Sequence, residues 1–156
     1  MQILVDSDSC PRAAREMLLR FSARLGIKSI FAANRPIPGI EVSPENGKTA
    51  LMEICPKSEG AADNRIVELA MPGDLAVTRD LPLAERLVDA GLTVMDDRGR
   101  LFTKENIREL RSLRDFTVGL AQNGLDFERT ASYGKKDVSA LANSLDRELS
   151  KVKGRR

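Results

Sequence analysis

The chain has 156 residues, 42% hydrophobic and 31% charged, with a formal net charge of +2, which suits one globular domain that buries its own core. No apolar run approaches the roughly 18 residues that cross a bilayer, and the first residues lack the basic segment of a signal peptide, so we expect a cytoplasmic protein without a membrane partner. Histidine is absent, which excludes His-dependent catalytic triads and disfavours zinc, and the two cysteines are too few for a disulfide framework.

The hydrophobic pattern predicts strands that alternate with helices along the chain. The expected strands cover residues 1–5, 27–33, 49–55, 75–78 and 92–95. The expected helices cover residues 11–25, 61–71, 81–90, 103–122 and 135–152. Residues 34–47 contain three prolines and two glycines and predict a loop, with or without a short edge strand near residues 40–42.

Local signals mark the ends of these helices. Gly26 stops the first helix, Asp80 is expected to cap the third, and Thr103 is expected to cap the fourth. Along the fourth helix, the apolar positions expected to face the core are Ile107, Leu110, Leu113 and Leu120.

Alternation of strands and helices predicts a three-layer α/β domain, in which a mainly parallel central sheet is flanked by helices. We assign residues 1–122 to this domain and expect residues 123–134, which are polar and contain two glycines, to form a linker. Residues 135–152 have an apolar stripe at helical spacing, so this helix should dock on the domain or on a second copy in a homodimer. Residues 153–156 form a basic tail.

Acidic residues follow three of the expected strands: the first is followed by Asp6 and Asp8, the fourth by Asp80, and the fifth by Asp96 and Asp97. The carboxyl ends of parallel strands share one edge of a sheet, so these side chains should meet there, and Asp63 at a helix start can approach the same edge. Clustered carboxylates raise one another's pKa, a penalty that a divalent cation removes, and oxygen ligands favour Mg²⁺ or Mn²⁺. We therefore predict a metal site with the ligands Asp6, Asp8, Asp63, Asp80 and Asp97, supported by Asn64 and Thr78.

Four residues at this edge also have an ordinary structural interpretation. Asp80 can serve only as a helix cap, and Asp96 with Asp97 can form a plain turn. Cys10 lies near a helix N-terminus, which favours a thiolate nucleophile. However, the glycines of a phosphatase loop are missing and two acids lie nearby, so we favour a packing role for Cys10.

The charge is distributed unevenly along the chain. Residues 1–96 carry 11 basic against 14 acidic residues, a net charge of −3, whereas residues 97–156 carry 14 against 9, a net charge of +5. One broad face of the expected helix over residues 103–122 presents Lys104, Arg108, Arg111 and Arg114. This face is predicted to bind RNA phosphates, and an ordinary solvated helix surface is the alternative.

Several segments form recognisable motifs: VDSDSCP at residues 5–11, GAADNRIV at 60–67, GDL followed by TRDLPLA within 73–84, and RG, T-x-ENI and RDF within 98–116. Together they resemble the YaiI/YqxD family of uncharacterised bacterial proteins over nearly the whole chain. That family is similar to PIN-like nucleases, so the resemblance implies a three-layer PIN-like fold and a Mg²⁺- or Mn²⁺-dependent ribonuclease. It assigns catalysis to Asp6, Asp63 and Asp80, adds Asp8 as a further acid, and makes Asp97 or Asp96 the fourth acid of the pattern. Residues 42–57 match no PIN pattern.

Two other functions stay open. A phosphatase of the haloacid-dehalogenase type would use Asp6 as nucleophile and Asp8 as acid, with Thr78 in its second motif. That mechanism requires a lysine between Thr78 and Asp96 to balance the phosphate charge, and the sequence has no lysine there. A non-catalytic RNA-binding or regulatory module with a vestigial metal site is the other alternative.

Overall fold

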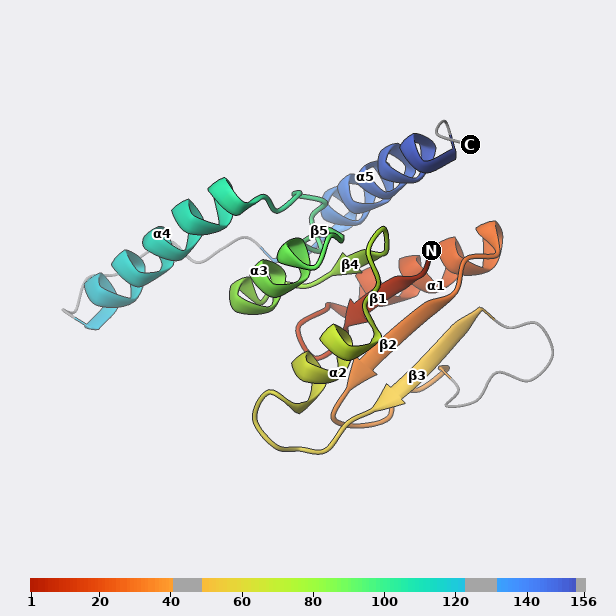
Figure 1. Cartoon of the computed structure of the whole chain (residues 1–156), viewed down its shortest axis with the longest axis horizontal. Helices are drawn as coiled ribbons and strands as arrows, with labels where there is room; N and C mark the ends of the chain where they lie inside the picture. Colours follow the sequence, from red (N-terminus) through yellow and green to blue (C-terminus); the bar gives the residue numbers. More distant parts are fainter. Residues whose placement is uncertain (41–48, 123–131, 154–156) are drawn as a thin grey trace.

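The computed structural model describes residues 1–40, 49–122 and 132–153, with residues 114–122 described by their backbone alone. Five parallel strands form one sheet in the order β3-β2-β1-β4-β5 (Figure 1). The strands are β1 (Ile3–Asp6), β2 (Ser29–Ala33), β3 (Ala50–Ile54), β4 (Leu75–Val77) and β5 (Thr93–Met95). The helices are α1 (Arg12–Leu25), α2 (Ala61–Leu69), α3 (Leu81–Asp89), α4 (Lys104–Gln122) and α5 (Lys135–Lys153). The predicted three-layer α/β class is confirmed.

The middle of the sheet carries the topological switch point. From β1 the chain moves outward through β2 to β3, and then returns to place β4 on the other side of β1. Loops that leave β1 and β4 therefore diverge from adjacent strands, and ligands of open α/β sheets bind in the crevice between such loops.

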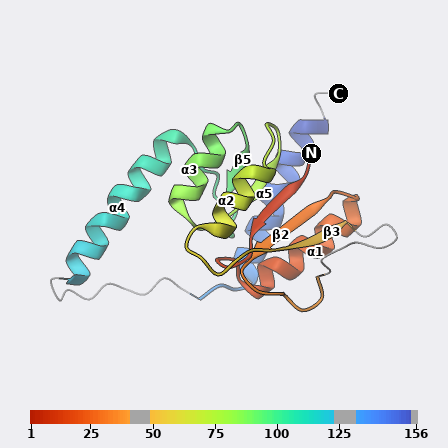
Figure 2. The same ribbon diagram turned by 60° about the horizontal axis from the view of Figure 1, so that its bottom comes forward.

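Alternate residues of the strands supply two cores on opposite faces of the sheet. On β1, the side chains of Ile3 and Val5 pack in the core that includes α1 and α5, whereas Leu4 packs with α2, α3 and the start of α4. Figure 2 shows α1 and α2 on opposite sides of the sheet. All four residues of β1 are buried, as expected for a central strand covered on both faces.

The apolar stripe of α5 is buried within the chain. Leu141, Leu145 and Leu149 lie in the same core as the inner side of α1, and an exposed ion pair joins Arg24 Nη2 to Asp146 Oδ1 at 3.6 Å. Most of the expected linker and the last three residues of the chain lie outside the described residues.

The predicted third strand is confirmed, whereas one predicted core position of the fourth helix is wrong. The third strand is β3, and residues 41–42 of the expected edge strand lie outside the described residues. The inward position expected for Leu113 is wrong, because 60% of this side chain is exposed, while Ile107 is buried. Figure 1 shows why: the second half of α4 projects away from the rest of the domain. The side chain of Leu120 is outside the described set.

None of the helices in the described ranges is long and apolar enough to cross a membrane.

The turn after β5 lies directly against α5. Gly99 has a φ of +79°, and a Cβ added there would lie 2.6 Å from the carbonyl oxygen of Ala140 and 2.6 Å from Oγ of Ser144. The Ser144 hydroxyl also donates a hydrogen bond of 2.7 Å to the Gly99 carbonyl. The close approach fixes the position of this turn relative to α5.

Replacing Gly99 with alanine should lower the free energy of unfolding by about 2–3 kcal/mol, because the methyl group would both strain a left-handed backbone and collide with α5. Gly73→Ala is a matched control, since Gly73 has a φ of +91° with no atom within 4 Å of an added Cβ. Its cost should be the backbone strain alone, about 1 kcal/mol. Urea unfolding measures both variants, and equal losses would show that α5 does not constrain the turn.

Candidate functional site

Two residues at the switch point are joined across adjacent strands. Asp6 ends β1, and Thr78 follows β4 directly, held by a backbone hydrogen bond of 3.0 Å from its amide to the Met95 carbonyl. The Thr78 hydroxyl donates to Oδ2 of Asp6 at 2.8 Å. The predicted supporting role of Thr78 therefore has a geometric basis, because its hydroxyl orients the carboxylate of Asp6.

The carboxylate of Asp6 is nearly enclosed, with only 5% of the residue exposed. Its Oδ2 also accepts a hydrogen bond of 2.9 Å from the Ser9 hydroxyl. Burial raises the pKa of Asp6 above its ordinary value, the hydrogen bonds from Thr78 and Ser9 lower it, and the charges of Asp8 and Asp80 raise it. The net shift is upward, so burial and the neighbouring carboxylates together outweigh the two hydrogen bonds.

Asp80 serves as the N-cap of α3, as the structural interpretation of this residue predicted. Its Oδ1 accepts a hydrogen bond of 2.9 Å from the Leu83 amide, and its own amide donates to the Thr78 hydroxyl oxygen at 3.0 Å. Capping fixes the orientation of the carboxylate and uses Oδ1, which leaves Oδ2 as a further acceptor in the same group. A capping role and a site role are thus compatible in one side chain.

Four of the five aspartates of the predicted site line one pocket of about 470 Å³ at the carboxyl edge: Asp6, Asp8, Asp63 and Asp80. Asp63 enters from the first turn of α2. Burial, followed by the charges of Asp80 and Asp6, raises the pKa of Asp63 to about 6. The mutual effect on pKa shows that these carboxylates are close enough to repel one another. We refer to this hollow as the aspartate pocket.

The donors of the aspartate pocket fit a hard divalent cation in their chemistry. Carboxylate oxygens are the ligands that Mg²⁺ and Mn²⁺ prefer. Burial first, and the charges of neighbouring aspartates after it, raise the pKa values of Asp6 and Asp63, and a cation would favour the ionised forms that both effects disfavour. Within the part of the chain that the structure describes, however, no three acidic or cysteine side chains already stand in an arrangement that could hold a metal ion. Complete coordination would therefore require side-chain rotation.

Asn64, the other predicted supporting residue, does not line the aspartate pocket. Its Oδ1 instead accepts a hydrogen bond of 3.0 Å from Nη1 of Arg86, which ties α2 to α3. The side chain thus holds two helices together beside the pocket.

Asp97 lies in a neighbouring hollow of about 740 Å³ and not in the aspartate pocket. Only 2% of Asp97 is exposed, its carboxylate pairs with the guanidinium of Arg79, and its carbonyl accepts a hydrogen bond of 2.5 Å from the Tyr133 hydroxyl. Oδ1 of Asp96 accepts from the amides of Arg98 and Arg100, each at 2.9 Å, as in the turn considered for this segment. The fifth predicted ligand is thus separated from the other four.

Cys10 is buried, and its pKa is raised to about 12, first by burial and then by the charge of Asp97. The side chain is therefore a neutral thiol at physiological pH, and it packs in the core beside α1. These observations agree with a packing role.

The basic face of α4 is partly neutralised by acids of α3. Lys104 Nζ lies 3.6 Å from Asp89 Oδ1, and Arg111 Nη1 lies 2.5 Å from Glu85 Oε2. Arg108 lines the same shallow hollow between the two helices, whereas the side chain of Arg114 is outside the described set.

Two residues of the site were missed from the sequence. Ser9 and Arg79 line both the aspartate pocket and the neighbouring hollow. Both residues belong to motifs whose aspartates were assigned to the site, so their position in the sequence could have indicated them. Tyr133, which lines the neighbouring hollow, falls in the expected linker and carried no signal.

Comparison with known proteins gives the following similarities. Residues 4–151 match the model of a family described as uncharacterised, the YaiI/YqxD family. A UPF0178 protein of Treponema pallidum (strain Nichols) is 45% identical over 152 residues, which cover 97% of this chain and 83% of the relative. A UPF0178 protein of Ectopseudomonas mendocina (strain ymp) is 36% identical over 97% of this chain and 99% of the relative. No solved structure matches the chain.

Proposed function

The chain belongs to the YaiI/YqxD family, and on this premise we propose that it is a metal-dependent PIN-like nuclease that cleaves RNA phosphodiesters in the aspartate pocket. One observation carries the proposal. Four aspartates from the end of β1, the following loop, α2 and the cap of α3 line a single pocket at the switch point of a parallel sheet.

Asp6, Asp63 and Asp80, with Asp8, are the residues that would hold the metal. A bound Mg²⁺ or Mn²⁺ supplies an activated water and a Lewis acid for the phosphate oxygens. The chain contributes orientation: hydroxyls fix the Asp6 carboxylate and the start of α3 fixes that of Asp80. Asp6 and Asp80 are thus held in place before a metal arrives, while complete coordination still requires other side chains of the pocket to rotate.

Phosphates that flank the reacting group also have partners at this pocket. Lys57 and Arg79 line it together with the aspartates. Cations at the rim of a carboxylate site favour a polyanionic substrate over a neutral one. RNA as the particular substrate rests on the similarity of the family to PIN-like nucleases.

A direct test combines two substrates. Purified protein is incubated with labelled single-stranded RNA and with a small phosphomonoester, each in Mn²⁺, in Mg²⁺ and in EDTA. The proposal expects RNA to be cut only with metal and the phosphomonoester to stay intact, because no aspartyl-phosphate forms at a PIN-like site.

The other outcomes separate the alternatives. Turnover of the phosphomonoester that disappears in Asp6→Asn would favour the haloacid-dehalogenase type of phosphatase. RNA that binds but is never cut, with either metal, would favour a non-catalytic module. Cleavage that is unchanged in EDTA would contradict a metal-dependent reaction.

A further inference from the structure

Two further hollows beside the aspartate pocket carry no role so far. The hollow of about 740 Å³ shares Asp8, Ser9 and Arg79 with the aspartate pocket. A third hollow, of about 380 Å³, shares Arg98 and Arg100 with the second. Shared lining residues show that the three hollows lie next to one another in a row along this side of the molecule.

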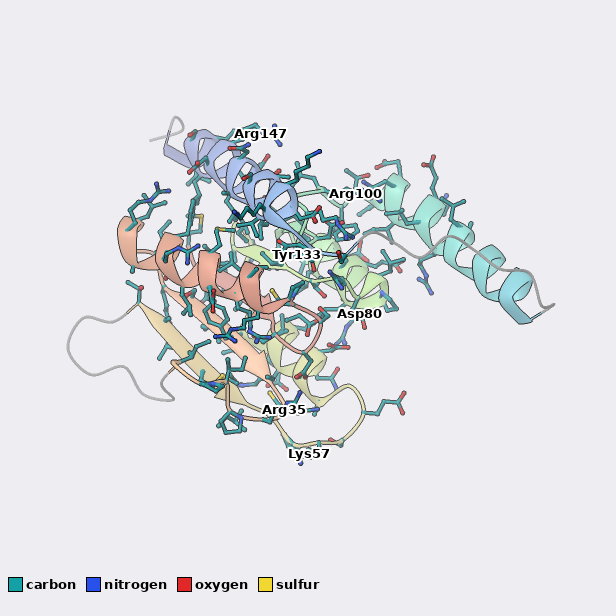
Figure 3. All side chains as sticks on the ribbon, turned by 180° about the vertical axis from the view of Figure 1, so that it is seen from behind. Arg35, Lys57, Asp80, Arg100, Tyr133 and Arg147 are labelled. Atoms are coloured by element: carbon teal, nitrogen blue, oxygen red, sulfur yellow. The ribbon has the colours of Figure 1, made fainter. Side chains whose placement is uncertain are left out.

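This path ends on α5, where Arg147 lines the third hollow. Figure 3 labels residues along it, and Asp80, Tyr133, Arg100 and Arg147 follow one another across the view. We call the second and third hollows together the arginine groove, after the four arginines that line them: Arg79, Arg98, Arg100 and Arg147.

Positive charge increases along the groove away from the aspartates. In the second hollow, Asp97 is buried beneath Arg79, and Asp96 is bonded to backbone amides of the turn. Among the residues that the structure describes, no acidic side chain lines the third hollow. Neither Arg100 nor Arg147 forms an ion pair with any side chain that the structure describes. Their charges are therefore available to an external anion.

The groove is also preformed. Arg98 Nε pairs with Asp137 Oδ1 at 3.0 Å, and its guanidinium lies 5.9 Å from the centre of the Tyr133 ring. Gly99, next to it, is held against α5 by the hydrogen bond from Ser144. Contacts of this kind fix the turn that carries Arg98 and Arg100 before any ligand arrives, which lowers the entropy cost of binding.

We propose that the arginine groove binds the backbone of single-stranded RNA that leads out of the aspartate pocket, with successive phosphates on the four arginines. The path of the RNA rests on the proposed function, because that function places the reacting phosphodiester among the aspartates. Contacts to the RNA backbone dominate, because the two aromatic residues among the described lining are poorly placed for base stacking. Tyr133 already lies beside Arg98, and Phe102 is buried, with 7% exposed. Binding should thus depend little on base sequence.

The groove is favoured over the basic face of α4 for a reason of charge. On α4, Lys104 and Arg111 already pair with Asp89 and Glu85 of α3, so phosphate would have to compete with carboxylates. In the groove, Arg79 and Arg98 also have carboxylate partners, Asp97 and Asp137. Arg100 and Arg147 have none among the described side chains, and Arg147 donates only to the neutral Ser144 hydroxyl, at 2.9 Å. The groove therefore offers two arginines without a carboxylate competitor, whereas the described part of α4 offers Arg108. A polyanion gains more from unpaired cations than from paired ones.

The test measures RNA binding in EDTA, so that it does not depend on cleavage. Fluorescence anisotropy of a labelled single-stranded RNA is followed at several salt concentrations for wild type and for the double variant Arg100→Gln/Arg147→Gln. Two lost phosphate contacts should flatten the slope of log K against log salt by about 1.4, and lower affinity by about 25-fold at roughly 0.1 M salt. Oligonucleotides of uridine and of adenosine should bind with similar affinity.

The matched control is Arg20→Gln/Lys28→Gln, which removes the same charge from two exposed residues that line neither hollow of the groove. Circular dichroism and thermal unfolding verify that both double variants fold. Equal losses of affinity in the two would overturn the proposal, because only net charge would then matter. A larger loss in Lys104→Gln/Arg111→Gln than in the groove variant would assign the RNA to α4 instead.

The two proposals can fail separately. Arginine-dependent binding without cleavage in Mn²⁺ would leave the groove standing and refute the nuclease. Cleavage with unchanged RNA affinity in the groove variant would refute the groove alone.

Discussion

Asp80→Asn should lower metal-dependent RNA cleavage by roughly 10²–10³-fold, and Asp6→Asn should lower it at least as much. Each change replaces a charged oxygen ligand by a neutral amide, which weakens the attraction for a divalent cation. Asparagine caps helices about as well as aspartate, so Asp80→Asn keeps the hydrogen bond to the Leu83 amide and the start of α3. Loss of activity in this variant therefore reports on the site and not on the fold.

A matched variant separates the site from the loss of a negative charge in general. Asp89→Asn removes the same charge from an exposed position at the other end of α3, and it should cut RNA at the wild-type rate. Rates are measured from the initial cleavage of a labelled RNA in Mn²⁺. Wild-type activity in Asp80→Asn would remove this residue from the proposed machinery.

Mg²⁺ or Mn²⁺ at a hundredfold excess over its dissociation constant should raise the free energy of unfolding by about 2.7 kcal/mol. The folded protein gathers four carboxylates in the aspartate pocket, and the unfolded chain separates them, so the cation binds the folded state preferentially. Burial and, to a smaller extent, neighbouring carboxylates raise the pKa values of Asp6 and Asp63, and a bound cation would offset both effects.

Thermal and urea unfolding in metal and in EDTA measure this linkage. Asp6→Asn should abolish most of the gain, whereas Asp89→Asn should keep it. If millimolar metal leaves the wild-type unfolding transition unchanged, the aspartate pocket does not select a divalent cation.

The fold and the aspartate pocket could be predicted from the sequence because both follow from local patterns. Apolar runs and helical periodicity identify the elements, and parallel pairing brings the ends of β1 and β4 to one edge. Asp6, Asp8 and Asp80 stand where those strands end, so their convergence needed no knowledge of loop structure.

Features that depend on packing between distant segments could not be predicted. Helical periodicity identifies the apolar side of α4, but it does not show how far along α4 the contact with α3 extends. Leu113 lies on the apolar side and is nevertheless exposed. The pairing of Asp97 with Arg79 depends on how two loops meet, which separates Asp97 from the other acids. The arginine groove exists only because α5 docks beside the turn at Gly99.

The most direct test of the central claim is a crystal of the protein soaked in Mn²⁺ and measured for anomalous scattering. The account predicts a peak in the aspartate pocket, within coordination distance of oxygens from Asp6 and Asp80 and joined by Asp63 or Asp8, which is absent from crystals of Asp6→Asn. A pocket that stays free of anomalous density at saturating Mn²⁺, in protein that still cleaves RNA, would contradict it.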